Sequence, residues 1–478
     1  MRPCIVLLLL LGCGHGLAPI RPVAPQEAAE PSAVWPGYVT EEDRALLADA
    51  EARLEHARKG ELLVTVRTAD GLPVRVPLDV RWRQVSHDFR FGVHSVFDPA
   101  VWGQLLRAGV NHGAVAVDWA STEPVADTWT TEAVEAAYGL GVLPDMGVSM
   151  RATAALWMRP ERTPAAVKDL QDKEALFRAV DRHVRGLVQR VRGDVVLWDA
   201  LKDPDATWSA ALGGSHNALV RLASTAVTAV RAVDNVVPIG ISLDDPLGLS
   251  VPSEGLRPLA FTKRLLDTGA DVDVLSLDFY YNAHLANDES AARASLGELA
   301  EGLRTYASFG KVLHVGGVSV PSTPHPDASR AGYWGRPWNP DLQAVYLRAF
   351  YTLAFADEAV RAVVWRDAVD ANAHVASGGL FERPGAAKPA FYALGDLIAG
   401  WTTRDRGLTG DEGQLRFRGF AGDYVIEVTS PTSGERLTRT ASVRERELDS
   451  LIIDLPASWE GVPFPTEPSG SARAEAPL

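Results

Sequence analysis

The sequence predicts an α/β protein built on a (β/α)8 TIM barrel, with a small N-terminal β module and a short C-terminal β appendage. Between residues 89 and 400, apolar runs rich in β-branched residues alternate eight times with amphipathic helical patterns. Eight strand–helix units are what such a barrel requires. A doubly wound open sheet is the competing architecture. No glycine-rich phosphate loop follows the first expected strand, which favours the barrel.

The strands and helices of the barrel are expected to follow each other at short intervals. The expected strands are 89–95, 113–118, 142–149, 195–201, 237–243, 272–279, 312–319 and 362–367. The expected helices are 99–109, 131–140, 168–191, 215–233, 256–269, 291–309, 339–356 and 389–400. In the helix at 168–191, apolar residues recur at three- and four-residue spacing, which is typical of a helix face packed on a core.

The fourth strand carries the most informative residues. Val195-Val-Leu is apolar, and Trp198-Asp199 and Lys202-Asp203 follow directly. A strand that is apolar and then ends in charged residues fits a parallel sheet buried on both faces. In barrels of this class the chemistry lies at the C-terminal ends of the strands. The sequence therefore predicts a polar site at Lys202 and Asp203.

The composition of the chain limits the class of protein and of partner. The chain has 478 residues, of which 46% are hydrophobic and 23% charged, with a formal net charge of −14. This acidic balance argues against nucleic acid as a partner.

The N-terminus has the pattern of a secretory signal, with Arg2, then a short apolar run, then small residues up to Gly14. Leu10-Leu-Gly-Cys13 resembles the bacterial lipobox, which implies lipidation of Cys13 and anchoring to the bacterial cell envelope, at the outer membrane or cell surface. An ordinary signal peptide is the alternative.

The chain is expected to divide into six segments. A helix capped by Thr40 precedes a hairpin, in which 62–67 and 74–82 pair about the turn at 69–71. After residue 403, short alternating strands return. The expected segments are 1–12, a lipoprotein signal peptide; 13–40, a flexible tether; 41–86, the N-terminal helix and β-hairpin module; 87–403, the barrel; 404–458, the C-terminal β appendage; and 459–478, a disordered tail.

The barrel resembles glycoside hydrolase family 10, whose best-known members are endo-β-1,4-xylanases, over residues of about 54 to 425. The matching segments occur in the family's order: 87–92, Asp118-Trp119 with Glu123-Pro124, Val195-Val-Leu-Trp-Asp199, Leu275-Ser-Leu-Asp278, 313–322, 363–370 and Lys388-Pro-Ala-Phe-Tyr-Ala-Leu394. The resemblance implies a TIM barrel, a β-1,4-linked, xylan-like polysaccharide as partner and no cofactor. It implies substrate contacts at Lys202, Asp278, Glu123, Trp119 and Trp365.

The catalytic positions depart from the family. Retaining glycosidases need two carboxyl groups roughly 5 Å apart. The family's acid/base glutamate is matched by Asp203, one methylene shorter, and the preceding asparagine by Lys202. The family's nucleophile is matched by Gly317, which has no side chain. Asp278 matches a glutamine, and residues 145–151 lack the family's histidine. The resemblance therefore indicates a member that has lost the nucleophile.

Several residues keep two interpretations. Asp203 is a residual general acid or a structural aspartate that Lys202 keeps ionised with a lowered pKa. A nearby aspartate could replace the nucleophile or serve as an inverting base, or each could be structural; the candidates are Asp278, Asp367 and Asp370. Asp244-Asp245 could join them or cap the next segment. Glu123 is structural or contacts sugar. Trp119, Trp157, Trp198 and Trp365 line a sugar cleft or pack in the core. No metal site is expected, because His94 and His314 lack ligand spacing.

Two functions remain open. The first is a catalytically degenerate, surface-anchored barrel of xylan metabolism that binds glycan. The second is an active or weakly active endo-β-1,4-glycanase or xylanase that uses Asp203 and a non-standard second carboxylate. Since a fold does not fix a function, the geometry of the site must decide between them.

Overall fold

The computed structural model describes residues 35–191, 195–249, 255–280, 294–324, 332–431 and 433–459. The expected signal peptide, Cys13, nearly all of the tether and the tail after residue 459 lie outside these ranges. No helix among the described residues is long and apolar enough to cross a membrane.

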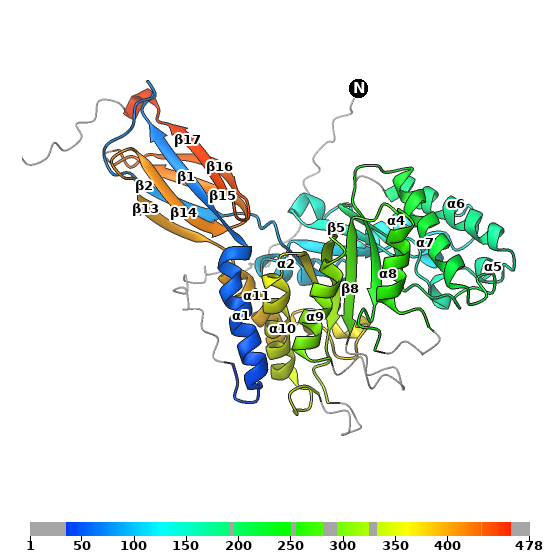
Figure 1. The fold of residues 1–478 in the computed structure, drawn as a ribbon. Helices are drawn as coiled ribbons and strands as arrows, with labels where there is room; N and C mark the ends of the chain where they lie inside the picture. The colour runs from blue at the N-terminus through cyan, green and yellow to red at the C-terminus, as the bar shows by residue number, and fades with distance from the viewer. Residues whose placement is uncertain are drawn as a thin grey trace, which may run out of the picture. The chain divides into compact units, whose positions relative to one another are not determined.

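The predicted (β/α)8 barrel is confirmed (Figure 1). Eight parallel strands close in the order β10-β3-β4-β5-β6-β7-β8-β9. They are β3 (Arg90–Val93), β4 (His112–Ala116), β5 (Ser149–Thr153), β6 (Leu197–Lys202), β7 (Ile239–Asp244), β8 (Val274–Tyr280), β9 (Val312–Ser319) and β10 (Val360–Trp365). The strands form because each is an apolar run that packs against helices on one side and the barrel interior on the other.

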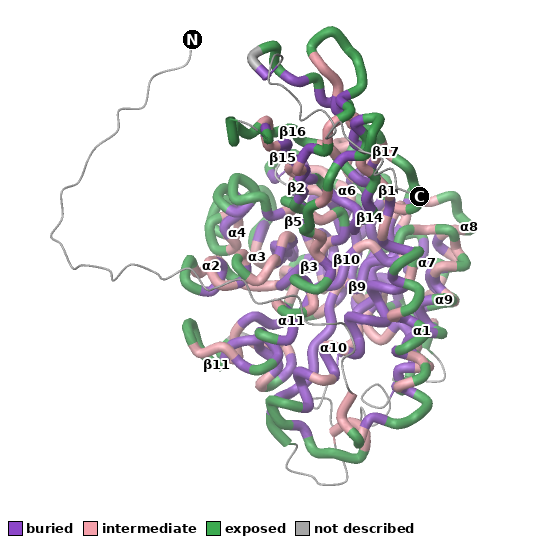
Figure 2. The backbone as a smooth tube through the Cα atoms, turned by 90° about the vertical axis from the view of Figure 1, so that its left-hand side faces the viewer, coloured by how far each residue is buried: buried purple, intermediate pink, exposed green. Residues whose placement is uncertain are grey.

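Helices surround the barrel at the expected places. They are α2 (Pro99–Arg107), α3 (Trp119–Thr122), α4 (Thr131–Tyr138), α5 (Ala165–Lys168), α6 (Lys173–Val191), α7 (His216–Arg231), α8 (Pro258–Asp267), α9 (Leu296–Ala307), α10 (Pro340–Ala356) and α11 (Pro389–Gly400). The apolar stripe of α6 is buried, including Val180, Val184 and Leu187. Figure 2 shows buried residues along the strands β9 and β10 and along α10.

The third strand was predicted about five residues too early. The expected strand at 142–149 is instead a turn and a short 3-10 helix, Pro144–Met146, followed by Gly147 in the left-handed conformation. The ladder starts only at Ser149, which pairs with His112 of β4. Pro144 fixes its own φ and donates no backbone hydrogen bond, so it ends the apolar run before a strand can form there.

The predicted N-terminal hairpin forms only at its turn, where Arg67 and Pro73 make an isolated antiparallel bridge, and its two strands do not pair with each other. The strand β1 (Lys59–Arg67) pairs with β14 (Gln414–Phe420) and β17 (Leu448–Asp454), while β2 (Asp79–Gln84) pairs with β13 (Arg404–Leu408) and β15 (Gly422–Thr429). The strand β16 (Arg436–Val443) completes the second sheet beside β15. The two strands of the expected hairpin therefore belong to different sheets.

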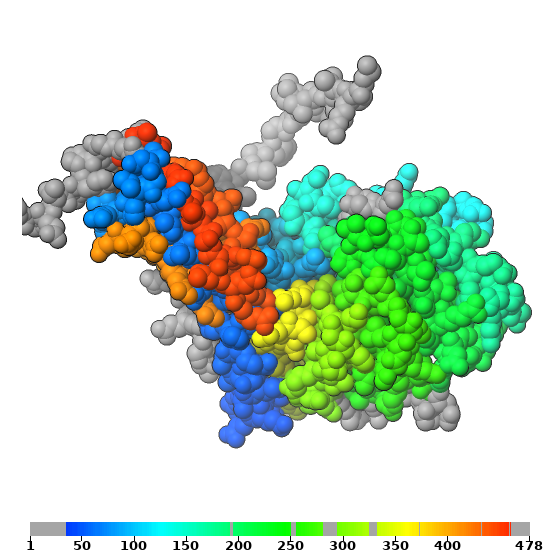
Figure 3. Space-filling model, turned by 45° about the horizontal axis from the view of Figure 1, so that its top comes forward, coloured from blue at the N-terminus to red at the C-terminus, as the bar shows by residue number. Residues whose placement is uncertain are grey.

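The segments predicted as separate β modules form two shared sheets with one core. The sheets have the orders β14-β1-β17 and β13-β2-β15-β16. Leu62 and Val64 from the first sheet and Trp82 and Ile426 from the second belong to one buried cluster. In Figure 3 the N-terminal strands (blue) lie among the C-terminal strands (orange to red). The helix α1 (Glu41–Ala57), which precedes β1, begins at the predicted cap, where the Thr40 hydroxyl accepts from the Asp43 amide at 3.1 Å.

The barrel interior contains charged side chains in place of the usual branched aliphatic ones. Arg151 on β5 donates from Nε to Asp199 on β6 at 2.7 Å and from Nη2 to the Ser276 hydroxyl on β8 at 2.6 Å. The exposed fractions of the Arg151 and Asp199 side chains are 1% and 0%. A Cβ on Gly316 would lie 2.8 Å from Arg151 Nη1, so glycine on β9 makes room for this pair. Polar groups therefore continue from the middle of the barrel to its C-terminal end.

Candidate functional site

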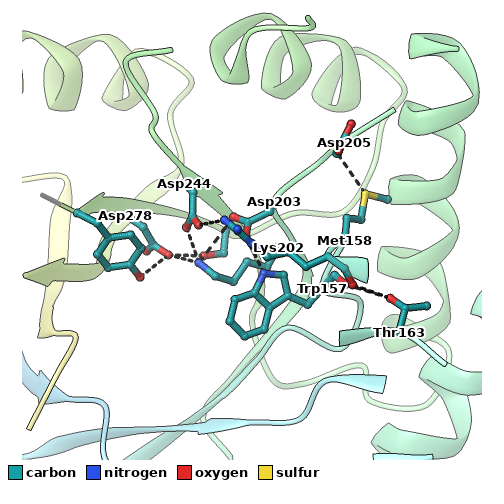
Figure 4. Close-up of polar contacts among 11 residues, drawn as sticks. Trp157, Met158, Thr163, Lys202, Asp203, Asp205, Asp244 and Asp278 are labelled. Atoms are coloured by element: carbon teal, nitrogen blue, oxygen red, sulfur yellow. Dashed lines mark hydrogen bonds and ion pairs between the residues drawn. The ribbon is translucent and has the colours of Figure 1, made fainter. Parts of the chain in front are cut away.

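Five charged residues meet at the C-terminal ends of β6, β7 and β8, and we call them the mouth cluster: Arg159, Lys202, Asp203, Asp244 and Asp278. Figure 4 shows the Lys202 side chain lying between the three aspartates. Parallel strands that end at one edge bring these residues together, although they are far apart in the sequence. The site predicted at Lys202 and Asp203 therefore contains more charges than the sequence indicated.

Lys202 binds three carboxylates. Its Nζ lies 2.6 Å from Asp244 Oδ1 and 3.9 Å from Asp203 Oδ1, and it also forms an ion pair with Asp278 Oδ2. The exposed fraction of its side chain is 7%. Burial lowers the pKa of Lys202, but Asp244, Asp278 and Asp203 raise it more, so the net pKa is above its ordinary value. The ammonium group is therefore held in its charged form at the centre of the cluster.

The shortest bonds of Asp203 come from residues that follow β5, and its ion pair with Lys202 is longer, at 3.9 Å. Its Oδ2 accepts from Trp157 Nε1 at 2.6 Å and from Arg159 Nε at 2.7 Å. Burial and the neighbouring Asp244 raise the pKa of the Asp203 carboxyl group, although Lys202 and Arg159 lower it. The lowered pKa expected from Lys202 is therefore wrong, because burial was not visible from the sequence. Asp203 also has a φ of +54°, which is uncommon for a residue with a side chain.

Asp244 is the second carboxylate of the cluster. Arg159 Nη2 donates to Asp244 Oδ2 at 3.0 Å while Arg159 Nε binds Asp203. The Asp244 and Asp203 oxygens lie 2.6 and 3.9 Å from the same Lys202 nitrogen, so they are separated by no more than the sum of these distances. That limit is compatible with the roughly 5 Å of a retaining pair. Both carboxylates, however, are already bound by cations.

Tyr280 fills the space of a nucleophile at Gly317. A Cβ on Gly317 would lie 2.8 Å from Tyr280 Cζ and even closer to its hydroxyl group. The Tyr280 hydroxyl donates to Asp278 Oδ2 at 3.0 Å, which fixes the ring in this position. The ring also contacts His374, with a distance of 4.5 Å between ring centroids. A carboxylate at residue 317 is therefore absent from the sequence and sterically excluded by the structure.

We expect Gly317→Glu to lower the free energy of unfolding by about 1–3 kcal/mol, because the new side chain overlaps Tyr280. Gly317 is not in the left-handed region, so its backbone conformation does not oppose a side chain. Urea denaturation would measure the cost, which should shrink in a Tyr280→Ala background. Gly141→Glu is the control, since a Cβ on Gly141 has no neighbour within 4 Å. An equal cost in both backgrounds would contradict the steric explanation.

Glu123 and Trp119 lie in a different group of contacts. Glu123 Oε2 is 2.7 Å from His183 Nδ1 on α6, and its exposed fraction is 0%. The Trp119 ring stacks on His183 at 4.2 Å between centroids, and Trp129 stacks on the same histidine at 5.5 Å. None of the contacts of Glu123 or Trp119 reaches the mouth cluster within the described ranges. They hold α3 and α6 together, so the structural interpretation fits them.

The tryptophans divide between core and site. Trp198 and Trp365 have an exposed fraction of 0% and belong to the barrel core, and Trp365 Nε1 donates to the Gly378 carbonyl at 2.9 Å. Trp157 alone of the four candidates contacts the mouth cluster, through its bond to Asp203. The sequence could not separate these cases, because large aromatic residues serve both cores and sugar sites.

The other candidate carboxylates have local partners. Asp367 accepts from the His374 amide at 2.6 Å, the Val375 amide at 3.1 Å and the Ser319 hydroxyl at 2.9 Å. Asp370 pairs with Lys388 at 2.7 Å. Asp245 Oδ1 accepts from the Leu249 amide at 3.1 Å, so in the pair 244–245 the first residue joins the cluster and the second caps a turn. The described residues contain no group of three or more metal-ligating side chains.

A closed eight-stranded parallel barrel with a charged cluster at the C-terminal strand ends places the protein in the class of (β/α)8 TIM barrels. No family model matches the sequence, and neither does any curated protein.

Solved structures of family 10 glycoside hydrolases share the fold of this chain. The family 10 protein of Paenibacillus barcinonensis has a TM-score of 0.51 and 16% identity, over 66% of this chain and 96% of that one. Native xylanase 10B of Thermotoga maritima has a TM-score of 0.51 and 14% identity, over 65% and 95%. Xylanase 10B of Thermotoga petrophila, in complex with xylobiose, has a TM-score of 0.50 and 15% identity, over 65% and 94%. The barrel therefore has the fold of glycoside hydrolase family 10.

Proposed function

We propose that the barrel mouth binds a β-1,4-linked, xylan-like glycan and does not hydrolyse it. The observation that carries this proposal is the replacement of the nucleophile by Gly317, whose side-chain space Tyr280 occupies. Without a nucleophile, a retaining mechanism has no covalent intermediate.

The remaining carboxylates also support loss of catalysis. A nucleophile or base needs a lone pair directed at the substrate, and a general acid needs a proton to give. Asp244 and Asp278 both face the Lys202 ammonium, and Asp203 accepts from Trp157 and Arg159. This arrangement neutralises the carboxylates with cations instead of leaving them available to a sugar.

Titration calorimetry with xylotetraose tests the binding proposal. The protein used should lack only residues 1–34, because Trp35 and Tyr38 pack against the barrel core and Val39 is buried. We expect saturable binding that Trp157→Ala weakens, because Trp157 is the candidate tryptophan at the cluster. Trp129→Ala, which removes an aromatic ring packed on His183, is the matched control. Absence of binding at millimolar xylotetraose would contradict the proposal.

Weak hydrolysis is the second candidate function. Burial and Asp244 raise the pKa of Asp203, which is the direction that a general acid needs. Asp244 would then act as the second carboxylate, on the other side of the Arg159 guanidinium. This reading requires that both Asp203→Ala and Asp244→Asn abolish a measurable turnover of an aryl xyloside.

The N-terminus supports anchoring at the cell surface as a separate proposal. The segment Leu10-Leu-Gly-Cys13 follows a basic residue and an apolar run, which is the pattern of a lipidated secretory signal. Mass spectrometry of the native protein should find a diacylglyceryl group on Cys13 as the first residue. A chain that retains Cys4 without modification would refute it.

A further inference from the structure

Arg366 faces the barrel interior at the same end as the mouth cluster. A Cβ on Gly92 would lie 2.8 Å from Val364 Cγ2 and 3.1 Å from His112 Cδ2, so Val364 points into the barrel. Alternate residues of a strand share a face, which places Arg366 on the inner side, one layer closer to the C-terminal end. The Arg366 amide continues the barrel ladder by donating to the Val318 carbonyl at 2.9 Å.

The Arg366 guanidinium has no hydrogen-bond or ion-pair partner within the described ranges. The adjacent carboxylate, Asp367, is already bound by two backbone amides and the Ser319 hydroxyl. Arg366 is only half-buried, yet burial lowers its pKa. A guanidinium that offers five donors and is partly desolvated is unusual without an anion. The two cations of the mouth cluster, Lys202 and Arg159, are each bound to at least two carboxylates.

His374 is a neighbour of Arg366 at this end of the barrel. His374 interacts electrostatically with Arg366, Lys202 and Arg159, and burial together with these cations lowers its pKa to about 3. The ring is therefore neutral at pH 7, and its Nε2 is buried without a hydrogen-bond partner. His374 packs on Tyr280, which links Arg366 to the position of the lost nucleophile. One unpaired cation and one unsatisfied imidazole nitrogen thus lie beside the proposed glycan site.

We propose that Arg366 binds the carboxylate of an acidic sugar, so that the preferred glycan is one that carries uronic acid residues. This inference rests on the proposed glycan binding and narrows its substrate class. The planar guanidinium matches a carboxylate in a bidentate geometry, which a neutral xylose unit does not offer.

Calorimetry on the protein lacking residues 1–34 would compare three probes: neutral xylotetraose, xylotetraose with one glucuronic acid branch, and inorganic phosphate. We expect the acidic oligosaccharide to bind about 10-fold more tightly than the neutral one, since a charged hydrogen-bonded pair is gained. Arg366→Gln should remove this preference and leave the affinity for xylotetraose unchanged. Arg366→Lys, which keeps the charge without the planar fork, should retain only part of the preference.

Arg304→Gln removes one exposed positive charge of α9 and is the control for net charge. It should leave the preference unchanged. Equal affinity for both oligosaccharides in the unmodified protein, or a preference that survives Arg366→Gln, would overturn the role of Arg366 while glycan binding stands. Phosphate that binds at Arg366 as tightly as the acidic oligosaccharide would overturn the assignment to a sugar. Failure of both oligosaccharides to bind would overturn both proposals.

Discussion

Replacement of Lys202 by methionine is expected to lower the free energy of unfolding by about 3–5 kcal/mol at pH 7, because one buried and two partly buried carboxylates lose their common cation. Asp203, Asp244 and Asp278 would then repel one another at close range. Urea denaturation followed by fluorescence would measure the change. Lys263→Met is the control, because its ion pair with Asp267 is exposed and contributes little.

The loss should depend on pH in a defined direction. Lys202 lowers the pKa of Asp203, which burial and Asp244 raise, so without Lys202 this pKa rises further above that of the unfolded chain. A folded state that binds more protons than the unfolded one becomes less stable as pH rises through the folded-state pKa. The destabilisation of Lys202→Met should therefore be largest at pH 7 and shrink towards pH 4. A loss of stability that is independent of pH would contradict the role of Lys202 as the common cation of the three carboxylates.

Asp199→Ala is expected to cost a similar amount, about 3–5 kcal/mol, because it leaves the Arg151 guanidinium unpaired inside the barrel. Both side chains are almost completely buried, and Arg151 keeps only its bond to Ser276. Burial raises the pKa of Asp199, whereas Arg151 and Lys202 lower it, with burial the larger effect. Chemical denaturation of the variant would measure the cost.

The double replacement Arg151→Met with Asp199→Leu is the matched comparison. It removes both charges and keeps an apolar filling of similar size, so it should be much less costly than Asp199→Ala alone. A double variant that is as unstable as the single one would show that the volume and shape of the pair matter, and not its charge.

The barrel could be predicted from the sequence because its signals are local. Each strand is an apolar run and each helix has its own apolar stripe, as in α6, so periodicity alone places both. The third strand shows the limit of this approach. Val142 and Leu143 read as the start of a strand, but Pro144 and Gly147 form a turn, and the pairing of Ser149 with His112 sets the true start.

The partners of the two N-terminal strands could not be predicted from local patterns. The segments of β1 and β2 alternate correctly and are separated by Asp70-Gly71, which favours a hairpin locally. Their actual partners lie more than 300 residues away, at β14 and β15. Alternation reports which face of a strand is buried but not which strand lies beside it.

The candidate site was predicted in part. Lys202, Asp203 and Gly317 follow from the position of strand ends and from the family resemblance. Tyr280 was missed, because its role depends on the space left empty by a glycine on the neighbouring strand. The sequence left two interpretations for Asp244, as a residue of the site or as a cap of the next segment. Only its contacts with Lys202 and Arg159 place it in the mouth cluster. Its location at the end of β7, level with Asp278, was the available signal.

Turnover of a chromogenic aryl xyloside and of xylan by the protein lacking residues 1–34 tests most directly the proposal that this barrel does not hydrolyse glycan. The assay should compare the unmodified protein with Asp203→Ala. We predict no release of product above the enzyme-free reaction in either case, since Gly317 and Tyr280 leave no nucleophile and Lys202 holds the carboxylates. Turnover by the unmodified protein that Asp203→Ala abolishes would contradict the account.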